Sequence, residues 1–313
     1  MAENKTIRTT LENGLTVLLR EIRSAPIISL WVWYRVGSRN EKPGKTGISH
    51  WVEHMQFKGT ARYEAGQMDR AISRVGGVWN AMTGDDWTTY YETIPESEAD
   101  LVLDIEADRM VGSLYLPEEV ESERTVVLSE LESLENSPSF RLETALRQAA
   151  FEVHPYRNDT IGNIADLKSI TRDDLYGYYR AYYAPNNAVL SMAGNFDADD
   201  MLEKIRAKFG SIPPAETPIC TVEPEAMIPE ERRVEVHGSG QLTFVEFAWR
   251  APDANDPDFC ALAVLTSILA GPPNLNMVGG GSITNQTSRL FRALVESGLA
   301  VGVSADLAAT IDP

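Results

Sequence analysis

The first part of the chain alternates between short apolar runs and turn-forming residues, which is the pattern of β-strands separated by tight turns. The run from Pro26 to Val36 is apolar on both faces, which predicts a central strand rather than an edge strand. Two further runs face each other across Gly84 and Asp85 and predict a hairpin. The expected strands are Leu11–Arg20, Pro26–Val36, the two arms of the hairpin Gly77–Pro95, and Asn187–Met192.

A second period, in which apolar residues recur every three or four positions, predicts helices between these strands. The segment from Gly47 to Gly59 is apolar nearly all round, so we expect this helix to be buried. The other expected helices are Ala65–Val75, Ser97–Val111, Leu116–Leu134, Ser139–Phe151, Arg172–Tyr183 and Asp197–Phe209. Strands and helices in this order predict an α+β domain over residues 1–211, with a mostly antiparallel sheet and helices packed on it.

The opening pattern returns after a segment rich in proline and acidic residues. That segment, 212–229, reads as a linker. Beyond it, Arg232–Val236 and Leu242–Trp249 are expected strands, and Phe259–Leu269 is an apolar helix in the place of the first buried helix. The chain therefore reads as a tandem duplication, in which residues 230–313 form the first part of a second, incomplete domain without chemistry of its own.

Charge and cysteine content narrow the class of protein. The formal net charge of -18 argues against nucleic acid as a partner, because phosphate binding requires lysine and arginine. The 2 cysteines build no disulfide framework, and no stretch reaches the length of a membrane span. No signal-like segment occurs near residue 1, so we expect a cytoplasmic protein, or a periplasmic one if a leader was removed before residue 1.

Two of the 4 histidines fall in one His-x-x-Glu-His unit within the buried helix. Helical spacing puts His50, Glu53 and His54 on one face, where two imidazoles one turn apart can share a metal ion. Zinc is the usual metal for such a pair, and Glu53 is placed to act as a general base on water. The alternative is a pair of core histidines that satisfy each other. The concentration of scarce histidines in one unit favours the metal.

The helix from Leu116 to Leu134 carries two glutamates within its apolar stripe. Glu123 and Glu130 share that face, whereas the other acidic residues of the helix lie off it. A carboxylate on a buried stripe requires a partner, because an unpaired buried charge is expensive. A metal ion would supply one.

These residues resemble the zinc signature of the pitrilysin/insulinase family of metallopeptidases, in the branch that contains the mitochondrial processing peptidase and its bacterial relatives. The inverted order His-x-x-Glu-His is that family's mark. Its third zinc ligand is a glutamate on a later helix at the spacing of Glu130, preceded by a second glutamate that matches Glu123. Further matches occur in the hairpin, at Asn80, Ala81 and Thr83, and in the run Tyr183–Ala188.

The resemblance implies a zinc endopeptidase with one Zn²⁺ per chain, held by His50, His54 and Glu130. Glu53 would be the general base. Glu123 is two helical turns from Glu130, so the two cannot both bind the metal, and Glu123 would instead contact a metal ligand. A peptide substrate would add as a strand to the hairpin arm that contains Asn80, Ala81 and Thr83. For Asn80 and Thr83, ordinary turn and strand-end chemistry is an equal alternative.

One departure from the family pattern concerns the second domain. Family members that act alone carry an Arg and a Tyr there, seven residues apart. Here the segment Ala293–Glu296 has no Arg where one is expected, and Val301 stands in the place of the Tyr. We therefore expect a heterodimer, in which a homologous subunit supplies the Arg/Tyr pair for substrate binding. The alternative is a non-catalytic structural or binding subunit of the same fold, but such a subunit would be expected to lose His50, Glu53, His54 or Glu130.

Overall fold

The computed structural model describes residues 5–226, 230–272 and 286–313. These residues divide into two compact units, one up to Glu246 and one from Phe247 onward. The expected linker has no helix or strand among its described residues 212–226, and 227–229 lie outside the described part. The domain limits given above stay a prediction, because the units divide beyond the end of the expected linker.

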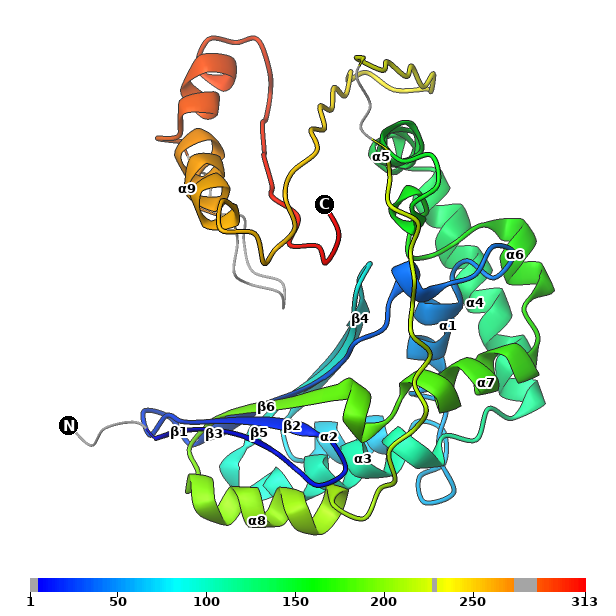
Figure 1. The fold of residues 1–313 in the computed structure, drawn as a ribbon, viewed down its shortest axis with the longest axis vertical. Coiled ribbons are helices and arrows are strands. Elements are labelled where there is room, and N and C mark those ends of the chain that lie inside the picture. Colours follow the sequence, from blue (N-terminus) through cyan, green and yellow to red (C-terminus); the bar gives the residue numbers. More distant parts are fainter. Residues whose placement is uncertain (1–4, 227–229, 273–285) are drawn as a thin grey trace. The chain divides into compact units, whose positions relative to one another are not determined.

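The first unit is built on a six-stranded sheet with the order β1-β2-β6-β3-β5-β4 (Figure 1). All neighbouring strands are antiparallel except β2 and β6, which are parallel. The central position predicted for Pro26–Val36 is confirmed, because β3 lies between β6 and β5. The strands are β1 (Thr6–Thr10), β2 (Thr16–Glu21), β3 (Ile27–Tyr34), β4 (Val78–Thr83), β5 (Thr88–Pro95) and β6 (Ala188–Gly194).

Several helices of the first unit pack on one face of this sheet, and the others pack against those helices or against one another. On β3, Leu30, Val32 and Tyr34 are buried toward the helices, while Trp31 and Trp33 stack on the opposite face. The α-helices are α1 (Ile48–Met55), α2 (Gln67–Arg74), α3 (Ala99–Gly112), α4 (Pro117–Glu135), α5 (Pro138–Ala150), α6 (Ile164–Ser169), α7 (Arg172–Tyr182) and α8 (Ala198–Phe209). Short 3-10 helices are η1 (Ser38–Asn40), η2 (Glu96–Glu98), η3 (Pro155–Arg157) and η4 (Pro185–Asn187).

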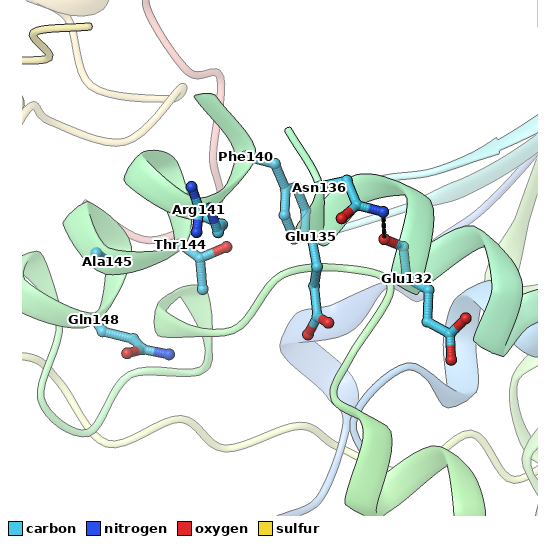
Figure 2. A pocket seen from close by; sticks show the side chains of 8 residues that line it. All are labelled: Glu132, Glu135, Asn136, Phe140, Arg141, Thr144, Ala145 and Gln148. Carbon is cyan, nitrogen blue, oxygen red and sulfur yellow. Dashed lines mark hydrogen bonds between the residues drawn. The ribbon is translucent and has the colours of Figure 1, made fainter. Parts of the chain in front are cut away.

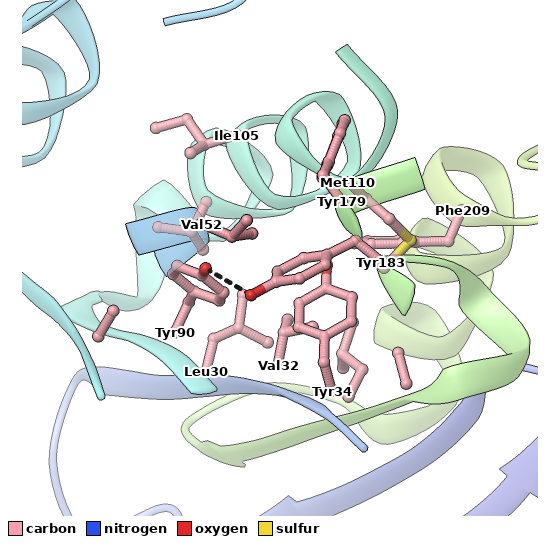
Figure 3. Close-up of a cluster of buried hydrophobic side chains, with 14 of the residues drawn as sticks. Leu30, Val32, Tyr34, Val52, Tyr90, Ile105, Met110, Tyr179, Tyr183 and Phe209 are labelled. Carbon is pink, nitrogen blue, oxygen red and sulfur yellow. Dashed lines mark hydrogen bonds between the residues drawn. The ribbon is translucent and has the colours of Figure 1, made fainter. Parts of the chain in front are cut away.

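The core joins the sheet to α1, α3, α7 and α8. Figure 3 shows residues of β3 and β5 meeting Val52 of α1, Ile105 and Met110 of α3, and Phe209 of α8. Tyr90 of β5 and Tyr183 hydrogen bond through their hydroxyl groups at 3.3 Å within this apolar setting. The burial expected for the histidine helix is confirmed, since Trp51 and Val52 are 0% exposed.

The start of α1 is fixed by a glycine and a carboxylate. Gly47 has a φ of 87°, and a Cβ there would lie 2.4 Å from the carbonyl oxygen of Ile161, so only glycine fits. The carboxylate of Glu41 accepts the backbone N–H groups of Gly47 (2.8 Å) and Ser49 (2.9 Å), which would otherwise lack partners at the helix start. Burial raises the pKa of Glu41 to about 8, against the opposing effect of these hydrogen bonds.

The expectations for the chain beyond the linker are only half right. The apolar helix exists as α9 (Phe259–Ala270), and a π-helical turn, η5, follows at Phe291–Val295. The strands expected at Arg232–Val236, Leu242–Trp249 and Ala300–Ser304 are absent from the described residues. A strand is stable only when its backbone groups pair with a neighbouring strand, and no partner is available in this part of the described chain.

Candidate metal centre

The two histidines of α1 turn their Nε2 atoms toward one point. The Nε2 atoms of His50 and His54 are 3.2 Å apart, and the ring centroids are 4.5 Å apart with the rings steeply inclined. This is the geometry that a spacing of one helical turn permits. The structure thus brings together the first two predicted ligands.

Glu130 of α4 completes a group of three. Its carboxylate oxygens lie 3.8 Å from His50 Nε2 and 3.5 Å from His54 Nε2. Zinc bonds of about 2.0–2.1 Å place two ligand atoms of a tetrahedral site about 3.3–3.4 Å apart. The three side chains therefore fit a zinc ion with little movement. In the described part of the chain, they form the group of histidine and carboxylate side chains that could hold a metal ion.

The reason given above for singling out Glu130 needs correction. Its side chain is 41% exposed, whereas that of Glu123 is 5% exposed. Helical period places both glutamates on one face of α4, but it does not say how far the covering helix extends. The neighbourhood of α1 buries Glu123, and Glu130 lies where that cover ends.

Glu123 holds His54 from the side opposite the ligand group. Glu123 Oε1 lies 2.8 Å from His54 Nδ1, and its Oε2 forms an ion pair with Lys58. When Nδ1–H donates to this carboxylate, the Nε2 lone pair of His54 is left for a metal. Burial alone would raise the pKa of Glu123, but the hydrogen bonds from His54 and Lys58 outweigh it and lower that pKa.

The two imidazoles differ in their protonation behaviour. Burial, helped by the neighbouring His54, lowers the pKa of His50 to about 3, so His50 is neutral at ordinary pH. For His54, burial lowers the pKa, but the hydrogen bond to Glu123 and the charges of nearby carboxylates raise it overall. A metal ion would compete with that proton, since only the neutral imidazole binds metal.

Glu53 lies beside the ligands and is held by the hairpin. Its carboxylate accepts a hydrogen bond from the Thr83 hydroxyl at 2.5 Å, at the end of β4. Glu53 is 8% exposed, and burial raises its pKa, partly offset by the Thr83 bond. A carboxylate with a raised pKa next to a metal-ligand group is a candidate general base, and this role of Glu53 stays a prediction.

The strand β4 is at the edge of the sheet, as strand addition requires. Asn80 is exposed, and its Oδ1 accepts the backbone N–H of Ala81 at 2.9 Å. Ala81 itself is buried, and Thr83 contacts Glu53 as described. The predicted substrate-binding residues thus lie on one strand next to Glu53, and their role stays a prediction.

A cavity of about 670 Å³ opens between the end of α4 and α5 (Figure 2). It is lined by polar side chains, among them Glu135, Arg141 and Thr144, and by Phe140. None of the three metal-ligand side chains lines it. No local sequence pattern marks this cavity, because it lies in the space between two helices.

Two supporting residues were also missed. One is Lys58, whose spacing of one helical turn from His54 indicates that it lies on the same side. Glu41 lies in a loop, and no motif marks it as the residue that binds the start of α1. Sequence spacing could have identified Lys58 but not Glu41.

A helix that carries His-x-x-Glu-His, joined by a glutamate from a second helix over one sheet, is the arrangement expected of the inverted zinc-motif class of metallopeptidases. Comparison with known proteins agrees. Residues 16–163 match the family model "Insulinase (Peptidase family M16)", and residues 169–312 match "Peptidase M16 inactive domain". The chain belongs to peptidase family M16, as its resemblance to the pitrilysin/insulinase family implied.

Three curated relatives have similar identity. The chain is 32% identical over 276 residues to a probable mitochondrial-processing peptidase subunit beta of Arabidopsis thaliana, covering 87% of this chain and 51% of the relative. It is 30% identical over 302 residues to an uncharacterized zinc protease of Streptomyces coelicolor, covering 95% and 63%. It is 33% identical over 267 residues to the zinc protease PqqE of Helicobacter pylori, covering 83% and 60%.

Among solved structures, the fold matches the crystal structure of a protease from Helicobacter pylori with a TM-score of 0.88 and 28% identity. That match covers 99% of this chain and 73% of the other. The chain spans about half to two thirds of the length of the three curated relatives. Within the described residues, no helix is both long and apolar enough to cross a membrane.

Proposed function

We propose that this chain is the zinc-bearing part of an endopeptidase that hydrolyses peptides or unfolded segments. The observation that carries the proposal is the convergence of His50, His54 and Glu130 at the distances of a tetrahedral zinc site. Three protein ligands hold one Zn²⁺ per chain and leave a fourth position open, as a catalytic site requires. Zinc bound there supplies Lewis-acid activation of water and of the scissile carbonyl group.

The protein side chains divide the remaining work. Glu53 takes a proton from the attacking water and returns it to the leaving amine, for which its burial and its contact with Thr83 prepare it. Glu123 keeps the Nδ1–H of His54 engaged, so that Nε2 faces the metal. The roles of acid–base catalyst and of orienting group thus fall to different carboxylates.

Substrate binding is assigned to the free edge of β4. A peptide that adds there as a strand gains main-chain hydrogen bonds and little sequence preference. Because Ala81 N–H is already bonded to the side chain of Asn80, that side chain must move when a peptide pairs with this N–H. Asn80, Ala81 and Thr83 would then contact the substrate.

A second, homologous chain is the proposed partner. It would supply the Arg and Tyr that are missing from their expected positions in Ala293–Glu296 and at Val301. The Arabidopsis relative is named as one subunit of a processing peptidase, which supports a division of labour between chains. This partner would lack His-x-x-Glu-His and retain the Arg/Tyr pair.

Metal analysis and peptide cleavage test the proposal together. The full-length protein, purified without added metal, is expected to contain one zinc, and His54→Ala is expected to lose it. A mixed peptide library is expected to be cut by the protein with its partner, and a chelator is expected to stop the cleavage. An unchanged zinc content in His54→Ala would rule out the proposed zinc site. Bound zinc without peptide cleavage, with or without a partner chain, would indicate a non-catalytic subunit.

A further inference from the structure

We propose that Lys58 is a positioning residue of the metal site, which acts through Glu123 on the ligand His54. The inference rests on the proposed function, because it concerns how the zinc ligand is held. It goes beyond the ligand set and the general base, since Lys58 touches neither the metal position nor the substrate strand in any contact that the structure shows.

The contact chain runs from Lys58 to Glu123 to His54. Lys58 lies one turn beyond His54, after the end of α1, and its ammonium group forms an ion pair with Glu123 Oε2. The other oxygen of the same carboxylate lies 2.8 Å from His54 Nδ1. Each oxygen of Glu123 is therefore occupied by one neighbour, and both neighbours come from the same short segment of chain.

Because Glu123 is buried, the loss of either of its partners should affect the other. The side chain of Glu123 is 5% exposed, so water has little access to replace a lost partner. A buried carboxylate that loses one partner is left with an uncompensated oxygen and turns to find another. Any rotation of the carboxylate that gives Oε2 a new partner moves Oε1 away from His54 Nδ1. The imidazole of His54 then loses its fixed orientation.

The cationic partner of Glu123 is a side chain of this same chain. Among the described residues, Lys58 is the lysine or arginine that pairs with Glu123, and its own side chain is 28% exposed. Glu53, the residue before His54 in α1, is held in a comparable way by the Thr83 hydroxyl. Each of these two carboxylates is thus fixed by a neighbour that is not one of the proposed metal ligands.

Zinc affinity of the full-length protein, measured by competition with a chromogenic chelator, tests the inference. Lys58→Met is expected to weaken zinc binding by about 3- to 10-fold. That loss is smaller than the 10- to 100-fold typical of direct partners of a ligand, because Lys58 acts one contact further out. Lys58→Arg keeps the charge and is expected to restore most of the affinity.

A matched control is Lys45→Met, which removes a lysine that pairs with Asp174 at 2.7 Å and is similarly exposed, at 33%. It is expected to leave zinc affinity unchanged. The visible spectrum of the Co²⁺-substituted protein gives a second readout, in which Lys58→Met is expected to change the ligand-field bands and Lys45→Met is not. Lys58→Gln serves as a second variant if Lys58→Met folds poorly by thermal melting.

A double-mutant cycle separates this inference from the proposed function. In a Glu123→Gln background, Lys58→Met is expected to have no further effect on zinc affinity. Equal zinc affinity and equal Co²⁺ spectra for wild type and Lys58→Met would overturn the inference while leaving the zinc site intact. An undiminished effect of Lys58→Met in the Glu123→Gln background would also overturn it, and a wild type that binds no zinc would overturn the site and the inference together.

Discussion

Two apolar helices, α1 and α9, occupy corresponding places in the two halves of the chain, and they differ in what surrounds them. In α1, Trp51 and Val52 are 0% exposed, because α4, α7 and β4 pack around the helix. In α9, Val264 is 60% exposed and Ile268 is 50% exposed. The apolar pattern produces a helix in both cases. It produces a buried helix only where a sheet and neighbouring helices are present.

The two helices also differ in their ends and in their chemistry. The first N–H groups of α1 are bound by Glu41, whereas α9 starts after Asp258 without a side-chain cap. α1 carries two histidines and a glutamate, and α9 carries no histidine or carboxylate. The metal-binding motif of α1 therefore depends on a helix start, on burial and on an opposing glutamate that other parts of the chain supply.

The largest expected effect is on catalysis, which only α1 supports. Glu53→Gln should lower peptide cleavage by about 10²- to 10⁴-fold, because the amide cannot accept the proton of water. Zinc content should stay at the wild-type level, since Glu53 is not a ligand. The matched control is Glu118→Gln, an exposed acid of α4. Retained cleavage, or zinc lost together with cleavage, would contradict the role of Glu53.

The next effect is on stability and compares the two helices directly. Met55→Ala in α1 should lower the free energy of unfolding by about 2–5 kcal/mol, because Met55 is 1% exposed and its removal leaves a cavity. Leu265→Ala in α9 should change it by no more than about 0.5 kcal/mol, because Leu265 is 48% exposed. Denaturant unfolding of the 313-residue chain measures both. Equal losses would show that α9 is buried in solution.

A smaller effect is expected at the support of the metal ligand. Glu123→Gln should weaken zinc binding by about 10- to 100-fold, since the amide is a poorer acceptor for His54 Nδ1–H and cannot pair with Lys58. Chelator competition gives the affinity, and Glu121→Gln, an exposed acid of the same helix, is the control. An unchanged affinity would reduce Glu123 to a role in packing.

The last prediction concerns Glu41 at the start of α1, which should make the stability of the chain depend on pH. Its pKa is about 8 in the folded chain and near the ordinary 4.5 when unfolded. The folded state therefore holds one more proton between these values, and stability falls as pH rises through that window, by at most about 1.4 kcal/mol for each pH unit. Glu41→Gln should flatten this dependence in unfolding experiments at several pH values. An identical slope in the variant would exclude Glu41 as its source.

Most of the first unit could be predicted from local pattern. The central strand, the hairpin and the buried histidine helix are confirmed, as their periods are strong. The first strand, β1, was missed because Thr6–Thr10 has one apolar residue and lies at the sheet edge. The parallel pairing of β2 with β6 was also missed, since pairing between distant segments leaves no local mark.

The sequence by itself determined which residues could bind zinc. Two histidines one turn apart and a glutamate between them are fixed by helical geometry, whatever surrounds the helix. The family to which the chain belongs follows from the same residues, with Glu130 and Glu123 at the expected places.

Only the tertiary structure decided how those residues are supported. The partial exposure of Glu130, the ion pair of Lys58 with Glu123, and the contact of Thr83 with Glu53 all join segments that are distant in the chain or lie past a helix end. It also decided that the alternating segment around Leu242–Trp249 stays unpaired in the described chain. The physical reason is that period and spacing fix the direction of a side chain, whereas burial and charge pairing depend on what packs against it.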